Sequence, residues 1–171
     1  MNEMNNALRL AGGVTYALAH YKADGALAWR ASLHNLMPMQ GRNYLLEAAF
    51  KGGPQVSQWY AALYEGDYTP TDDVTAATLV HLATECTAYD GTSRQGVQFS
   101  AVSDAALDNT ASKASFVMTA PKQIRGLFMS SVPVRGSNAG VLASVVRLPS
   151  PKELGVGDRL EVTVRMALVS L

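Results

Sequence analysis

The closing stretch of the chain, residues 159–171, is the segment that most constrains the fold. From Leu160 onward, apolar residues occupy every second position, namely Leu160, Val162, Val164, Met166 and Leu168. Charged and polar residues fill the positions between them as far as Arg165. This period of two is typical of a β-strand with one buried face. Because a long, flat strand at a sheet edge promotes aggregation, we expect this strand to lie inside a sheet.

Two further strands are predicted near the start of the chain. The runs 14–21 and 26–34 flank Lys22-Ala23-Asp24-Gly25. Asp-Gly between two strand-like runs is a strong hairpin signal, because glycine accepts the positive φ that the turn requires. The second run alternates as well, and its predicted core face consists of Leu27, Trp29, Ala31 and Leu33.

The pattern after Gly96 is β throughout. Strand-like runs at 96–102, 114–120, 123–132 and 139–148 precede the closing strand, with breaks such as 136–138 and 151–155 between them. An aromatic-rich run at 55–66 adds another strand. Short strands with a turn about every ten residues indicate an antiparallel sandwich or barrel. We predict a mainly β fold, an antiparallel β-sandwich of about seven or eight strands with one short α-helix covering one end.

The convincing helical segment is MPMQGRNYLLEAAFKGGP, residues 37–54. Pro38 suits the first turn, and the Gly-Gly-Pro sequence at 52–54 ends the helix. Its apolar stripe is expected to contain Met39, Leu46, Ala49 and Phe50. The long connection that follows, 65–93, is weakly patterned, and we expect it to be part loop and part short helix around residues 74–82.

One domain accounts for the chain. At 171 residues, area scaling predicts that about 70% of the unfolded surface is buried, so the core requires neither a metal nor a disulfide. We assign residues 14–171 to a single β-sandwich domain and residues 1–13 to an N-terminal arm. The single cysteine, Cys86, rules out an intrachain disulfide and is expected to be a packing residue.

Charge and hydropathy narrow the classes of partner. The formal net charge is +0 and no dense Lys/Arg cluster is visible, so nucleic acid is not an expected partner. The start, MNEMNNALRLAGG, has an acid where a signal peptide has bases, and no stretch approaches the ~20 apolar residues of a membrane span. We expect a protein that does not cross a membrane by itself.

Three histidines lack the spacing of a metal pair. His20, His34 and His81 are far apart in the sequence, and the i, i+4 or short-loop spacing of zinc ligands is missing. His20 and His34 lie at the ends of one predicted hairpin, so a His-pair site is the alternative to two polar residues near a sheet rim. The polar interpretation is favoured.

The acidic run Asp67, Asp72, Asp73 invites comparison with a calcium loop. An EF-hand loop places ligands at alternate positions with a central glycine and a closing glutamate, and DYTPTDD does not. Turn-forming acids are the favoured interpretation, since Asp and Pro favour turns for backbone reasons. We predict no metal site and no cofactor.

Catalytic and phosphate-binding motifs are also missing. No G-x-S-x-G elbow occurs. Gly12-Gly13 precedes a strand, and the segment 136–140 lies between two strands as a hairpin connection, so neither opens a helix as a phosphate loop does. We predict no catalytic residues.

Four aromatic residues allow two interpretations. Trp29, Trp59, Tyr60 and Tyr64 suit either the core of a small β domain or a carbohydrate platform, as in a receptor-binding module. Core packing is favoured, because Trp29 lies on the apolar face of its strand.

Four blocks of the sequence carry a family resemblance: residues 34–71, 83–99, 108–132 and 156–168. They contain H-N-L, a leucine-rich helix, G-G and W-Y-x-x-L, then T-E-x-T-x-Y, R-Q, D-N-x-x-S-K-A-x-F and G-D-x-L-x-V-T. This order resembles a widespread family of small tailed-bacteriophage virion proteins, from about Val14 to the C-terminus. The chain departs from the family pattern at Met37-Pro38-Met39 and at the Pro-rich break from Pro149 to Pro151.

The resemblance implies a non-enzymatic structural protein of the virion, assembled in the host cytoplasm. We expect it to decorate or cement the capsid, with the major capsid protein or other virion proteins as partners. A tail or fibre component that binds a receptor or glycan is the alternative. A small hydrolase is a third class, disfavoured because no catalytic constellation is visible.

The N-terminal arm is the predicted connector. It is polar and ends in glycines, yet it carries Leu8, Arg9 and Leu10 as a small contact motif. We expect these residues to form a subunit interface in a homo-oligomer, a trimer or dimer, or on the capsid floor. A loose terminus without a partner is the alternative.

Overall fold

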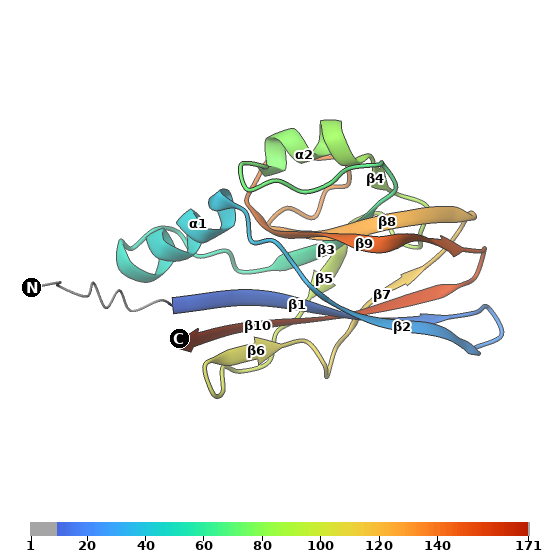
Figure 1. The fold of residues 1–171 in the computed structure, drawn as a ribbon, viewed down its shortest axis with the longest axis horizontal. Coiled ribbons are helices and arrows are strands. Elements are labelled where there is room, and N and C mark those ends of the chain that lie inside the picture. Colours follow the sequence, from blue (N-terminus) through green and yellow to red (C-terminus); the bar gives the residue numbers. More distant parts are fainter. Residues whose placement is uncertain (1–9, 171) are drawn as a thin grey trace, which may run out of the picture.

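The computed structural model describes residues 10–170, which form two antiparallel sheets and two helices (Figure 1). The strands are β1 (Leu10–Tyr21), β2 (Leu27–His34), β3 (Trp59–Tyr64), β4 (Glu85–Cys86), β5 (Gln95–Val97), β6 (Ala106–Asp108), β7 (Ala114–Val117), β8 (Lys122–Ser130), β9 (Leu142–Leu154) and β10 (Arg159–Ser170). The helices are α1 (Met39–Phe50) and α2 (Ala76–Ala83). The predicted antiparallel β-sandwich is confirmed.

The first sheet has the order β2-β1-β10-β6, and β7 also pairs with β10. The closing strand β10 therefore lies between β1 on one side and β6 and β7 on the other, as predicted. Its pairing with β1 runs from Leu10 opposite Ser170 to Tyr21 opposite Arg159. The predicted alternation holds in the burial of Leu160, Val162 and Val164, but Leu168, which was expected on the same buried face, is 51% exposed.

The second sheet has the order β4-β3-β8-β9, and β5 also pairs with β3. The predicted break at Pro149–Pro151 is wrong, because β9 continues through both prolines to Leu154. Since β9 is the last strand in the order of this sheet, residues without an N–H are tolerated there. The pairing of β9 with β8 shifts register between Ile124 and Gly126, which accommodates the interruption.

The main core fills the space between the two sheets. It includes the fully buried side chains Tyr16, Phe116, Leu127 and Val162. The Tyr16 hydroxyl shares a buried hydrogen bond with the Ser144 hydroxyl, which links β1 of one sheet to β9 of the other. Burial raises the pKa of Tyr16, so the phenol remains a neutral hydrogen-bonding group.

Helix α2 covers the outer face of the second sheet (Figure 1). Leu79 and Ala83 of the helix share a buried cluster with Tyr64 and Phe128. The helix begins with a capping box in which the Thr75 hydroxyl accepts a hydrogen bond from the Thr78 backbone N–H. It is the short helix expected around 74–82, and it makes two helices where one had been predicted for the sandwich.

Helix α1 exposes the stripe that was expected to define its apolar face. Met39 is 49% exposed, Leu46 57% and Phe50 81%, so the pattern predicted the helix but not its orientation. Gly41 is the buried residue of α1. A Cβ on Gly41 would lie 2.6 Å from the Ala143 carbonyl oxygen, so this close approach to β9 sets which side of the helix faces the sheet.

Strand β1 starts earlier than the expected domain boundary. It begins at Leu10 rather than Val14, because β10 offers backbone partners as far as Ser170. The predicted arm of residues 1–13 therefore contributes residues 10–13 to the sheet. Leu10 lies in this strand, while Leu8 and Arg9 lie outside the described residues, and their role in a subunit interface stays a prediction.

Candidate functional site

An apolar groove runs between α1 and the first sheet, at the end of the sandwich where β1 begins and β10 ends. It consists of two adjoining hollows of about 300 Å³ and 230 Å³. Met37, Leu45, Leu107 and Met166 line both hollows. Further lining residues are Tyr44, Trp59, Phe99, Gly13, Val102 and Leu168. We call this feature the α1 groove.

The close approach of α1 to β9 explains why the groove is apolar on its helical side. Leu45 and Ala48 follow Gly41 by four and seven residues, so they lie on the same side of the helix and line the groove. Tyr44 packs edge-on against Trp59, with 5.4 Å between the ring centroids. The Tyr44 hydroxyl accepts a hydrogen bond from the Val56 backbone N–H at 2.6 Å, which fastens the segment after α1 to the helix.

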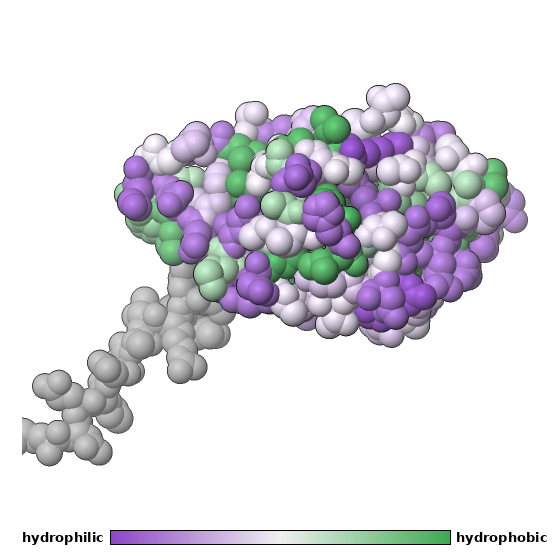
Figure 2. Space-filling view, turned by 90° about the horizontal axis from the view of Figure 1, so that it is seen from above, coloured by the Kyte–Doolittle hydropathy of each residue, from purple (hydrophilic) through white to green (hydrophobic). Residues whose placement is uncertain are grey.

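The opposite side of the helix forms a second apolar surface. Met39, Leu46 and Phe50, which we call the outer α1 stripe, point into solvent. Figure 2, which looks down on the molecule from above Figure 1, shows hydrophobic residues in green at the left end, over the region of α1. A large aromatic side chain that is 81% exposed is a feature of interaction sites more than of free surfaces.

The histidine pair, which was the disfavoured alternative, does not form. His20 lies opposite Trp29 in the β1–β2 pairing, whereas His34 lies opposite Thr15 near the other end of the hairpin. His81 is exposed in the last turn of α2. Among residues 10–170, no group of three or more His, Cys, Asp or Glu side chains is close enough together to hold a metal ion.

His20 instead helps to hold a turn. Its Nε2 lies 2.8 Å from Asp158 Oδ2, and the same carboxylate accepts hydrogen bonds from Lys22 Nζ at 3.0 Å and Gly155 N at 2.9 Å. Burial by itself raises the pKa of Asp158, but the hydrogen bonds from Gly155, Lys22 and His20 outweigh it and lower the pKa to about 2. This cluster ties the β1–β2 hairpin to the turn before β10.

Two residues of the acidic run, Asp67 and Asp72, form ion pairs across the surface. Asp67 Oδ1 accepts a hydrogen bond from Arg147 at 2.5 Å, and the two Asp72 oxygens accept a bidentate pair from Arg42 at 2.7 and 2.8 Å. These bonds lower the pKa of both aspartates. The loop is thereby tied to β9 and α1, which agrees with the structural interpretation.

The four aromatic residues do not share one platform. Tyr64 is buried beneath α2, and Trp29 and Trp59 pack against the main core from different sheets. Tyr60 is half-buried next to Trp59 on β3, so the two rings point to opposite sides of the strand. Core packing therefore holds for three of the four, and Trp59 also lines the α1 groove.

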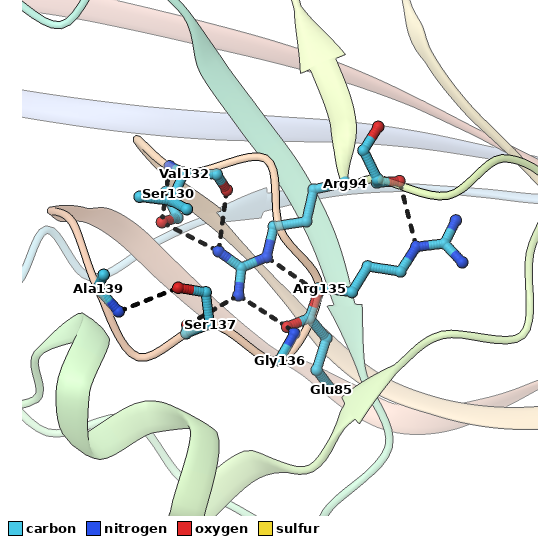
Figure 3. Close-up of polar contacts among 9 residues, drawn as sticks. Glu85, Arg94, Ser130, Val132, Arg135, Gly136, Ser137 and Ala139 are labelled. Atoms are coloured by element: carbon cyan, nitrogen blue, oxygen red, sulfur yellow. Dashed lines mark hydrogen bonds and ion pairs between the residues drawn. The ribbon is translucent and has the colours of Figure 1, made fainter.

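The most heavily bonded polar cluster surrounds Arg94 (Figure 3). The Arg94 side chain is 1% exposed and its partner Glu85 is 5% exposed. The guanidinium donates to both Glu85 oxygens, at 2.9 and 2.8 Å, and to three further oxygens, on Ser130, Val132 and Ser137. All five N–H groups of the guanidinium donate hydrogen bonds within the protein. The cluster therefore holds the β8–β9 loop in place and leaves no donor for a ligand.

Arg135 holds the loop between β4 and β5 in place in the same way. Its guanidinium lies 3.8 Å from the centre of the Tyr89 ring and donates to backbone carbonyl oxygens of Thr87, Tyr89, Asp90 and Ser93. Burial raises the pKa of Tyr89 to about 12. Cys86 is buried beside this network, and burial raises the pKa of its thiol, as expected of a packing residue.

The sequence pointed to only a part of the groove. Trp59 and Met166 were noted, but as core residues, while no sequence pattern marked Leu45, Leu107 or Val102 as groove residues.

Neither a family model nor a curated protein matches the chain. Within residues 10–170, no helix has the length and apolar character needed to cross a membrane.

Proposed function

We propose that the chain is a non-enzymatic structural protein of a bacteriophage virion, which decorates or cements the capsid. The observation that carries the proposal is the apolar α1 end of the sandwich, where the α1 groove and the outer α1 stripe lie on opposite sides of one helix. A protein that works by being built into a particle requires such a contact surface.

The polar clusters of the described residues support this assignment. Arg94, Arg135 and Asp158 each use their hydrogen-bonding groups on neighbouring loops. Such bonds keep a small sandwich rigid, which suits a part that presents a fixed surface to its neighbours. The likeness of the sequence blocks to small phage virion proteins points in the same direction.

Immunogold labelling of phage particles tests the location. Antibody against the purified chain is expected to label the capsid shell, and the gene is expected beside the major capsid gene. Label confined to the tail would replace the capsid role with the alternative, a tail or fibre component that binds a receptor or glycan. Purified particles free of the chain would refute both.

A further inference from the structure

The α1 groove lies beside the entry of the N-terminal segment into the sheet. Leu10, the first residue of β1, is opposite Ser170, the last residue of β10. Gly13 of β1 and Leu168 of β10 line the groove. Residues 1–9 therefore join the domain next to an apolar hollow, and nine residues reach about 30 Å from that point when extended and about 14 Å as a helix.

The composition of residues 1–9 matches the groove. Met1, Met4 and Leu8 recur at intervals of three and four, the spacing that places side chains on one face of a helix. Apolar residues at this spacing are the anchors by which a short helix binds a hydrophobic groove. Met37 and Met166 in the lining add flexible side chains that adapt to such anchors.

The geometry of β1 favours the groove of another copy. Because β1 stays paired with β10 up to Leu10, the chain enters at the end of the sheet in line with the strand. To enter its own groove, the chain would have to reverse direction before Leu10. A neighbouring copy receives the same segment without that reversal, and exchanged segments close into a symmetric oligomer.

We propose that residues 1–9 of one copy bind in the α1 groove of a second copy and hold the chain in a closed homo-oligomer. The inference rests on the proposed function, because it uses the α1 end as an assembly surface and names its occupant. It leaves the outer α1 stripe free for other virion proteins.

A mixing experiment with the purified chain tests this exchange. One variant lacks residues 1–9 and keeps the groove. The other keeps residues 1–9 and carries Val102→Asp with Leu168→Asp, two lining residues that are 71% and 51% exposed and tolerate a charge in the folded monomer. The matched control carries Val134→Asp with Val156→Asp, which are 60% and 62% exposed and do not line the groove.

Light scattering after size exclusion measures the mass of each species, and circular dichroism checks the fold. The wild type and the control are expected to be dimers or trimers, and each variant alone is expected to be a monomer. The 1:1 mixture of the two variants is expected to form a heterodimer, in which one segment binds in one groove. A wild type that is monomeric, a variant that stays oligomeric, or a mixture that stays monomeric overturns the inference. Since no capsid is present, none of these results bears on the immunogold test.

Discussion

Replacing Arg94 with methionine is expected to be among the most damaging single changes in the chain. Methionine keeps much of the buried volume but removes five hydrogen bonds, including both to Glu85. The Glu85 carboxylate, 5% exposed, would keep the Gly136 backbone N–H at 2.8 Å and have no cation. Breaking a buried ion pair from one side costs about 3–5 kcal/mol, since the remaining charge stays uncompensated.

Urea unfolding followed by the fluorescence of Trp29 and Trp59 measures this cost. Lys113→Met is the matched control, because Lys113 also pairs with a glutamate but is 41% exposed, and surface pairs contribute at most about 1 kcal/mol. Adding Glu85→Gln to Arg94→Met removes the uncompensated charge and is expected to restore part of the loss. If the free energy of unfolding of Arg94→Met lies within about 1 kcal/mol of the wild-type value, the Arg94 cluster does not stabilise the β8–β9 loop as inferred.

Two further predictions concern stability. Gly41→Ala is expected to lower the free energy of unfolding by about 1–3 kcal/mol, because its Cβ would lie 2.6 Å from the Ala143 oxygen. This cost exceeds the ~1 kcal/mol that alanine gains over glycine in a helix. A shift in the Trp59 emission would report the displacement of α1, and Asn43→Ala, at an exposed position of α1, is the control. The folded pKa of Asp158, about 2, is below its ordinary value of 3.8, so its stabilisation is complete above about pH 4 and is lost as the pH falls toward 2, up to about 2 kcal/mol. The difference in unfolding free energy between the wild type and Asp158→Asn is expected to shrink across that window, and a constant difference would contradict the assignment.

Much of the fold follows from local patterns in the sequence. The alternation of the closing strand predicted its place inside a sheet, and Asp24-Gly25 predicted the β1–β2 hairpin, in which Gly25 has φ +86°. Strands β4 and β6 were not predicted, because segments of two or three residues are too short to show a period, and the strand predicted at 96–102 is limited to β5. The described chain therefore has ten strands rather than about seven or eight.

The errors come from features that only the tertiary structure decides. Pro149 and Pro151 indicate a break, yet they are tolerated because β9 ends the strand order of its sheet. The stripe of Met39, Leu46 and Phe50 predicted a buried face, but the contact of Gly41 with β9 turns it outward.

The α1 groove could not be predicted from sequence patterns, because only the tertiary structure brings its lining residues together. Leu45, Leu107 and Met166 are far apart in the chain, and each is an ordinary apolar residue in its own segment. The burial of Arg94 was equally hidden, because an arginine in a loop is usually exposed.

Incorporation of variants into particles tests the central proposal, that the chain is a virion protein whose α1 end is the assembly surface. Phage lacking the gene would be grown with the wild type, with Leu46→Asp/Phe50→Asp, or with Leu82→Asp, a control on α2 that is 50% exposed. We expect the outer-stripe variant to fold with the unfolding free energy of the wild type and to be lost from purified particles, while the control is retained. Incorporation of the outer-stripe variant at the wild-type level would contradict the account.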